Sequence, residues 1–373
     1  MYSPDFSGKK SIWATLKPYV NVFDGTLLLL VCLILAVSTV NMVSAGSGFP
    51  GRLEDHLRNI ALSFVIIWLA ALVPPQMLMR LAAPIYAVGV ALLVGVALFG
   101  IIKLGARRWI NVGVVIQPSE IMKIAMPLML AWWFQKREGT ISWQEFMVAG
   151  VLLAIPAALI IRQPDLGTGT LVTAAGFYVI FLAGLSWKVL GGLFIAGASF
   201  MPIAWNMLHD YQRHRVMTLI DPTTDPLGKG FHIIQSMIAI GSGGMTGKGW
   251  MNGTQGHLQF IPERTTDFVF AVYSEEFGLM GNMLLLVLYL LLIGRGLLIA
   301  ANAPTLFSRL LAGALSLMFF TYAFVNMGMV SGILPVVGVP LPFMSYGGTA
   351  FVTLGLAVGI LMSIHRHRKL MQS

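Results

Sequence analysis

The sequence predicts an all-α, polytopic integral membrane protein with about ten transmembrane helices and one large external loop between helices seven and eight. Three observations support this fold class. Of the 373 residues, 57% are hydrophobic and only 10% are charged, whereas a soluble domain carries roughly 25% charged residues. Apolar windows of bilayer-spanning length, roughly 20 residues, recur along the chain. A single long polar segment interrupts them.

Each apolar window is expected to be helical, because a helix satisfies its own backbone hydrogen bonds inside lipid. The predicted spans are Gly25–Ser44, Leu57–Val73, Leu81–Ile102, Pro118–Phe134, Trp143–Ile161, Leu166–Leu185, Trp187–Leu208, Phe268–Ile293, Leu306–Met329 and Tyr346–Ile364. We divide the chain into an amino-terminal tail (1–24), one membrane domain (25–364) that includes the loop 209–267, and a carboxy-terminal tail (365–373).

Basic residues near the chain ends predict the orientation. Lys9, Lys10 and Lys17 precede the first span, and residues 365–369 read HRHRK. Since Lys and Arg favour the cytoplasmic side, an even number of crossings places both termini in the cytoplasm and the long loop in the periplasm. The cytoplasmic loops are then expected to hold Arg80, Lys136, Arg137, Lys188, Arg295 and Arg309. The formal net charge of +9 therefore reflects topology and not nucleic-acid binding.

Charged residues on the predicted outer side break this pattern. The connection at residues 103–109 reads KLGARRW, which indicates either snorkelling basic side chains around Trp109 or an anionic ligand, such as a diphosphate at the outer leaflet. Glu120 and Lys123 share a face of the next span. Charges at such depth are functional or mutually paired, and both interpretations are open. Asp165 lies in another charged outer turn.

The loop 209–267 is far longer than the roughly 12–15 residues beyond which loops are usually functional or disordered. It contains Arg213 and Arg215, and its apolar residues 233–240 predict a short amphipathic or re-entrant helix. The run GSGGMTGKG at 241–249 departs from the nucleotide-binding P-loop motif. It is either a tight turn or a set of backbone amides that faces an anion.

The loop ends in PERTTDF at residues 262–268, where Glu263 and Asp267 bracket Arg264. Asp267 either caps the following helix or takes part in catalysis. Residues 330–344 carry no charge but contain three prolines. Irregular apolar backbone at membrane depth is buried in protein or lines a cavity, so we expect this segment to form the wall of a lipid-accessible groove.

The segment 326–348, reading NMGMVSGILPVVGVPLPFMSYGG, resembles the signature of the RodA, FtsW and SpoVE proteins; we refer to it as the signature segment. Further matching blocks extend the resemblance over nearly the whole chain: ARRWI from Ala106, QPSEIMKIA from Gln117, QPDLGTG from Gln163, DYQRHRV from Asp210, DPLGKGFHIIQSMIAIGSGG from Asp225 and PERTTDFVFAV from Pro262. The PER form and the short amino-terminal tail favour the elongation-type RodA subgroup over the division-type FtsW subgroup.

The resemblance implies a ten-helix peptidoglycan glycosyltransferase that polymerises lipid II into the nascent glycan strand, beside a class B penicillin-binding transpeptidase of the elongation machinery. The family's essential aspartate corresponds to Asp267, its acid and lysine to Glu120 and Lys123, and its loop arginine to Arg108. Asp267 is then the expected general base, and undecaprenyl diphosphate is the leaving group of an inverting displacement. The cations expected to stabilise the diphosphate are Arg108, Lys123, Arg213, Arg215 and Lys248, with Asp165, Glu263 and Arg264 as further substrate contacts.

No dedicated cofactor or metal site is predicted, because the loop histidines are scattered. A divalent cation such as Mg²⁺ or Mn²⁺ would be shared with the diphosphate. Two other functions fit the same features. A lipid II flippase would also use polytopic helices with interior charges and broken backbone, although no internal repeat is evident. A non-catalytic scaffold that activates a penicillin-binding protein would need only helix faces and a long loop.

Overall fold

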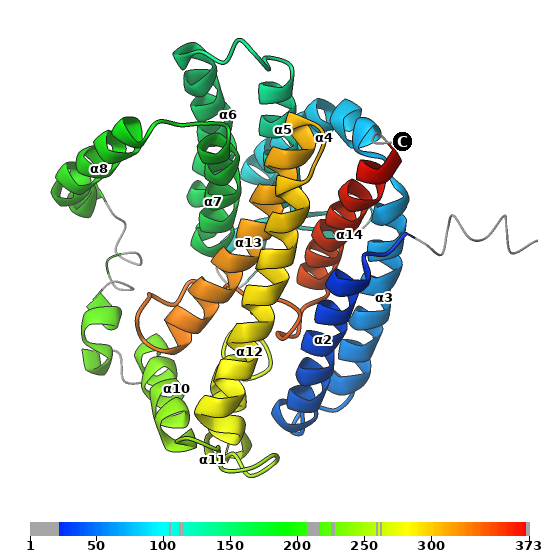
Figure 1. The fold of residues 1–373 in the computed structure, drawn as a ribbon. Coiled ribbons are helices and arrows are strands. Elements are labelled where there is room, and N and C mark those ends of the chain that lie inside the picture. The colour runs from blue at the N-terminus through cyan, green and yellow to red at the C-terminus, as the bar shows by residue number, and fades with distance from the viewer. Residues whose placement is uncertain are drawn as a thin grey trace, which may run out of the picture.

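The structure is a computed structural model, and it describes residues 22–103, 106–111, 113, 115–207, 213, 217–224, 228–258, 260, 261 and 263–370. Within these residues, every predicted span overlaps one long helix (Figure 1). These helices are α2 (Gly25–Ala45), α3 (Arg52–Leu72), α4 (Pro75–Phe99), α5 (Pro118–Gln135), α6 (Trp143–Arg162), α7 (Leu166–Leu182), α8 (Trp187–Met207), α12 (Val269–Ala301), α13 (Leu306–Val330) and α14 (Gly348–Leu370). Seven of them are long and apolar enough to cross a membrane, and α7 is apolar but shorter. The predicted polytopic helical fold is confirmed.

Several helices extend beyond the apolar windows. Arg80 lies within α4, Arg295 within α12 and Arg309 within α13, and Lys188 is the second residue of α8. The expectation that these four lie in loops is wrong, whereas Lys136 and Arg137 do follow the end of α5. Long basic side chains near a helix end can reach the membrane interface, so an apolar window underestimates the length of its helix.

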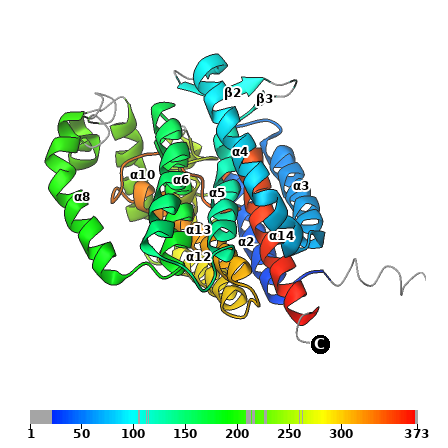
Figure 2. The ribbon, with the colours of Figure 1, turned by 90° about the horizontal axis from the view of Figure 1, so that it is seen from above.

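A short antiparallel sheet follows α4, where the sequence predicted that the helix continued to Ile102. Its strands are β1 (Ile101–Lys103), β2 (Ala106–Asn111) and β3 (Val115–Ile116), in the order β1-β2-β3. Ile102 pairs with Arg107, and Ile110 pairs with Ile116. The meander lies at the edge of the molecule beside α4 (Figure 2). It brings the chain back to the start of α5 and thereby positions Arg108.

The long helices of the bundle, α8 excepted, alternate in direction, so their connections gather at two ends (Figure 1). We call the loop end the one that carries the connections after α2, α4, α6 and α13, together with α10 (Lys229–Gly243) and α11 (Thr254–His257). The tail end carries the connections after α3, α5, α7 and α12, and the end of α14. In the bundle, α14 packs on α3, α12 on α13 and α2, and α5 on α4, α7 and α13. Most residues of α13 and α14 are buried, so these two helices form the centre.

Helix α8 stands apart from this bundle in both views (Figures 1 and 2). Its described side chains are almost all exposed from Gly191 onward. An apolar cleft of about 420 Å³ separates its first turns from α6 and α7. An apolar helix exposed on all faces is compatible with lipid and not with water.

The external loop contains the predicted short helix. Residues 233–240 lie within α10 (Lys229–Gly243), which packs on α12 and α13. The one-turn helices η1 (Pro222–Thr224) and α11 (Thr254–His257) flank it along the chain. The Ser236 hydroxyl donates to the Val330 carbonyl over 2.8 Å. These contacts fold the loop against the loop end of the bundle.

Candidate functional site

The turn at residues 263–268, here called the Asp267 turn, is held by the signature segment. Three successive carbonyl oxygens of the turn accept hydrogen bonds from it. The Tyr346 amide donates to Thr265 over 2.8 Å, the Ser345 hydroxyl to Thr266 over 2.7 Å, and the Asn326 amide group to Asp267 over 2.9 Å. Because the carbonyls of Thr265, Thr266 and Asp267 each have a partner, the backbone that carries Asp267 has a fixed position and direction.

The carboxylate of Asp267 lies against Gly338 of the signature segment. A Cβ atom added to Gly338 would be 3.2 Å from Asp267 Oδ2, and the glycine has φ +74°. The side chain of Asp267 is half-buried. Phe268, and not Asp267, occupies the N-cap position of α12, so the interpretation of Asp267 as a helix cap is wrong.

Arg264 and Glu263 differ in their environments although they are adjacent in sequence. Arg264 is 3% exposed and donates to the carbonyls of Ala45 over 2.9 Å and Gly256 over 2.7 Å. Burial lowers the pKa of its guanidinium, but an arginine still keeps its charge at neutral pH. Glu263 is exposed and accepts from the Thr266 hydroxyl over 2.7 Å. Arg264 thus anchors the turn to α2, and Glu263 faces outward.

Glu120 and Lys123 form an ion pair at the start of α5. Lys123 Nζ is 2.5 Å from Glu120 Oε1, and the lysine side chain is only 3% exposed. The Thr353 hydroxyl of α14 donates to Glu120 Oε2 over 3.2 Å. The mutual pairing that the sequence left open is therefore present, and one carboxylate oxygen is shared with α14.

Next to this pair, an apolar groove of about 390 Å³ runs between α4, α5 and α14. Its polar lining residues are Gln117, Glu120, Thr349 and Thr353; the others include Ile85, Ile121, Leu128, Val352 and Ile360. The signature residues 330–344 do not line this groove but pack against the Asp267 turn. This groove therefore does not have the wall that the sequence led us to expect. Within the segment Val339 and Leu341 are buried, whereas Ile333 is 70% exposed.

Arg108 meets Asp165 beside the groove. Arg108 Nη2 donates to the Pro164 carbonyl over 2.5 Å, and Nη1 lies 3.9 Å from Asp165 Oδ1. Asp165 also caps α7 by accepting from the Thr168 amide over 3.2 Å, and it accepts from Gln117 Nε2 over 3.0 Å. The buried Nε of Arg108 has no hydrogen-bond partner among the described residues.

Lys248 pairs with a buried acid of α12. Its Nζ is 2.6 Å from Glu275 Oε1, and the Glu275 side chain is fully buried. The amides of Lys248 and Gly249 donate to the carbonyls of Glu275 and Glu276, both over 3.0 Å. This packing lies beside Gly278, where α12 departs from helical geometry with φ +62°. The glycine run is therefore a tight turn on α12, and these two amides do not face an anion.

The remaining predicted contacts lie outside this cluster. Arg213 donates to the carbonyls of Trp205 over 3.0 Å and Asn206 over 2.7 Å, near the end of α8. Arg215 falls outside the described residues. Within the described part of the chain, no group of three His, Cys, Asp or Glu side chains is arranged to hold a metal ion.

Sequence reasoning missed four polar residues that shape the site: Gln117, Glu275, Asn326 and Ser345. Asn326 and Ser345 lie in the signature segment, yet an uncharged side chain in an apolar stretch gives no local signal of a long-range bond. Asn326 is fully buried and donates to Val339 over 2.7 Å as well as to Asp267. Glu275 lay inside a predicted span, where a buried charge was the available signal.

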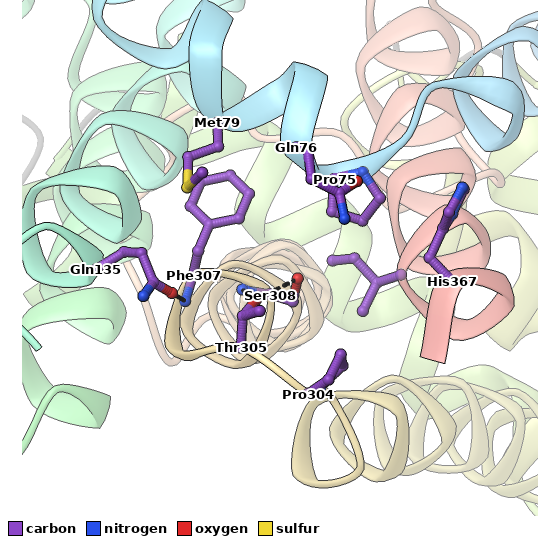
Figure 3. Close-up of a pocket in the computed structure, with 10 residues that line it drawn as sticks. Pro75, Gln76, Met79, Gln135, Pro304, Thr305, Phe307, Ser308 and His367 are labelled. Carbon is purple, nitrogen blue, oxygen red and sulfur yellow. Dashed lines mark hydrogen bonds between the residues drawn. The ribbon is translucent and has the colours of Figure 1, made fainter. Parts of the chain in front are cut away.

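A second cavity, of about 140 Å³, lies at the tail end between α4, α13 and α14 (Figure 3). Gln135 accepts there from the Phe307 amide over 2.7 Å, and His367 stands on the α14 side. The cavity and the Asp267 turn lie at opposite ends of the bundle.

The fold and the loop-end cluster define a polytopic membrane protein with an acidic residue on a firmly held turn and an apolar groove between α4, α5 and α14. The profile of the family described as "Cell cycle protein" (FtsW, RodA and SpoVE) matches residues 20–370. The chain belongs to this family, as the sequence predicted.

Two curated relatives illustrate the similarity. The peptidoglycan glycosyltransferase MrdB of Escherichia coli K12 is 50% identical over 369 residues, which cover 98% of each chain. Stage V sporulation protein E of Bacillus subtilis is 38% identical over 275 residues, covering 72% of this chain and 74% of the relative.

Solved structures show the same fold. A chain of a peptidoglycan synthase complex that coordinates polymerization and crosslinking superimposes with a TM-score of 0.80 at 34% identity, covering 93% of this chain and 98% of the other. The rod shape determining protein RodA of Thermus thermophilus gives a TM-score of 0.70 at 29% identity, covering 93% and 97%.

Proposed function

We propose that this peptidoglycan glycosyltransferase elongates glycan strands from lipid II at the outer face of the inner membrane, with Asp267 as the general base. The observation that carries the proposal is the fixed Asp267 turn, whose three successive carbonyls are bound by the signature segment. General-base catalysis needs a carboxylate within hydrogen-bond reach of the proton that it removes. A rigid backbone beneath the side chain meets that need.

The reaction follows from the chemistry of the substrate. The glucosamine 4-hydroxyl of an acceptor lipid II attacks the anomeric carbon of the growing strand and gives its proton to Asp267. The new bond joins the acceptor oxygen to the anomeric carbon, while the bond from that carbon to the diphosphate oxygen breaks. Undecaprenyl diphosphate leaves with the bonding electron pair. A single displacement inverts the anomeric configuration from α to β without a covalent enzyme intermediate.

The departing diphosphate needs positive charge, which preorganised cations supply. Arg108 fits this role best among the predicted cations, because its side chain is 32% exposed and its ion-pair contact with Asp165 Oδ1 is long, at 3.9 Å. Lys123 and Lys248 already pair with Glu120 and Glu275, which supports a positioning role for these two lysines. A divalent cation such as Mg²⁺ or Mn²⁺, if used, would bind together with the diphosphate.

The groove between α4, α5 and α14 suits the polyprenyl chain of the substrate. Its walls are apolar, and its polar residues include Gln117 and Glu120, close to the Arg108 and Asp165 pair. An undecaprenyl tail laid in this groove would keep its diphosphate near the loop end. We further propose that both termini are cytoplasmic, and that a class B penicillin-binding transpeptidase of the elongation machinery binds this chain.

The test is polymerisation of labelled lipid II by the purified protein together with its transpeptidase partner. Asp267→Asn should lower the rate by about 100-fold to 10,000-fold, the usual contribution of a general base, while elution volume and complex formation stay unchanged. The matched control is Asp221→Asn, which changes an exposed carboxylate of the same external loop and should leave the rate intact.

The two rival functions predict different results in the same assay. A flippase would move labelled lipid across proteoliposomes without forming polymer. A scaffold would leave the Asp267→Asn protein fully able to stimulate its partner. Undiminished polymer synthesis by Asp267→Asn would refute the proposed role of this carboxylate.

A further inference from the structure

Arg52, the first residue of α3, is held between two aromatic rings at the loop end. Its guanidinium carbon lies 4.2 Å from the centroid of Tyr346 and 4.9 Å from that of Phe49. The guanidinium of Arg264 contacts the same Phe49 ring at 4.9 Å. Cation–π contacts of this kind fix the plane of a guanidinium.

The two arginines differ in what their N–H groups do. Arg264 donates to two backbone carbonyls, as described above. For Arg52, the part of the chain that the structure describes provides only the ring contacts and no hydrogen bond or ion pair to its guanidinium. Arg52 is also half-buried and thus reachable from outside. A guanidinium carries five N–H donors. Since Arg52 is half-buried and the described chain offers these donors no acceptor, they can bind an anion from outside the protein.

The position of Arg52 connects it to the proposed site. Tyr346, which stacks on Arg52, donates its amide to Thr265 of the Asp267 turn over 2.8 Å. Thr349, three residues after Tyr346 and in the first turn of α14, lines the apolar groove. Arg52 therefore lies where the polar end of a lipid seated in the groove would approach the candidate base.

The surrounding charges leave Arg52 available. Asp55, one turn further along α3, pairs with Arg58 at 3.0 Å and accepts from the Tyr346 hydroxyl over 3.3 Å. Glu54 is exposed. Lys123 and Lys248 are neutralised by their own acids. An anion at the loop end would therefore find in Arg52 a cation without a protein counter-ion in the described chain.

We propose that Arg52 binds an anionic oxygen group of the lipid-linked substrate in a bidentate manner, an inference that rests on the proposed function. The group is either the diphosphate or a carboxylate of the attached peptide, since both offer the paired oxygens that a guanidinium edge recognises. Asp267 then takes the proton of the acceptor hydroxyl, while Arg52 binds the diphosphate or the peptide carboxylate of the lipid-linked substrate.

The experiment measures binding in nanodiscs to protein that carries Asp267→Asn, so that turnover is slow during the measurement. The two probes are undecaprenyl diphosphate and lipid II. Arg52→Gln should raise the Kd by about tenfold or more, which is the scale of a charge-assisted hydrogen bond. Arg58→Gln is the matched control, because it changes an exposed arginine of the same helix; its Kd should stay within about twofold.

Weaker binding of both probes identifies the diphosphate as the bound group, and weaker binding of lipid II alone identifies a peptide carboxylate. Unchanged affinity for both probes overturns the inference. If Arg52→Gln elutes as misfolded protein, Arg52→Lys is measured in its place. Lysine keeps the positive charge but lacks the planar guanidinium that binds two oxygens. An affinity of Arg52→Lys equal to that of the parent protein therefore also overturns the inference. Failure of the proposed function would appear separately, as absence of polymerisation by protein with Asp267 intact.

Discussion

At the scale of single residues, the candidate site depends on how firmly the backbone holds Asp267 in one position. Asn326, Ser345 and Tyr346 each hold one carbonyl of the Asp267 turn. Each such buried bond contributes only about 1 kcal/mol to stability, yet an unmatched buried partner costs about 1–3 kcal/mol. Moving the Asp267 turn from this position would break all three bonds, which costs much more free energy than breaking one. Gly338 completes the arrangement by leaving room for the carboxylate.

We expect Gly338→Ala to lower kcat about tenfold with little change in KM. The new Cβ would stand 3.2 Å from Asp267 Oδ2, and alanine would have to adopt φ +74°, at a cost of roughly 1–2 kcal/mol. The measurement is lipid II polymerisation at several substrate concentrations, together with thermal unfolding.

The matched control for this prediction is Gly332→Ala in the same segment. Gly332 has φ +73°, so the backbone strain is equal, but the nearest atom to its added Cβ is the flexible Met237 Sδ at 2.9 Å. An equal loss of kcat in both variants would show that backbone strain alone, and not contact with the carboxylate, is responsible.

At the scale of helices, α12 joins the two ends of the bundle. It starts directly after the Asp267 turn, breaks its helical geometry at Gly278, and reaches the tail end with Arg295. There Arg295 bonds Asp24, the residue that caps α2, with Nε at 3.0 Å from Oδ1 and Nη2 at 2.5 Å from Oδ2. His365 of α14 lies 3.3 Å from Asp24 Oδ2. One carboxylate thus connects α2, α12 and α14.

This junction predicts an acid-dependent loss of stability. Burial alone would raise the pKa of Asp24, but the hydrogen bonds from Arg295 and the Leu27 amide and the charge of His365 outweigh it and bring the pKa below 3.8. The folded protein thus favours the ionised carboxylate. The resulting stabilisation is complete above about pH 4, the ordinary carboxyl value, and is lost as the pH falls through the lowered pKa.

We expect Asp24→Asn to lower the free energy of unfolding by about 2 kcal/mol at pH 7, the scale of a charged hydrogen bond, and to flatten its dependence on pH below about 4. The measurement is thermal unfolding in detergent across that range. Glu138→Gln, which changes an exposed carboxylate at the same end, should leave the pH dependence as it is. A steep acid dependence that persists in Asp24→Asn would place its origin elsewhere.

At the scale of the whole molecule, the transmembrane helices could be predicted from the sequence, because they must be apolar. The hydrogen bonds that build the candidate site could not, because they join distant segments. An apolar window must become a helix in a membrane, and the Glu120 and Lys123 pair followed from local spacing. The bonds from Tyr346 to Thr265 and from Asn326 to Asp267 join segments about 60 to 80 residues apart. No periodicity encodes such contacts, so only the family motif pointed to them. The β meander was missed because its strands are short and follow a helix directly.

The last prediction concerns which face of the membrane carries the site. Alternating helices place Glu138, after α5, at the tail end and Asn252, in the external loop, at the loop end; both residues are exposed. With Cys32 replaced by Ser, Asn252→Cys should react with an impermeant maleimide in spheroplasts. Glu138→Cys should react only after permeabilisation, because basic residues favour the cytoplasmic side. Since the Asp267 turn shares the loop end with Asn252, the opposite labelling pattern would place the carboxylate in the cytoplasm, away from externally assembled glycan, and the proposed mechanism would fail.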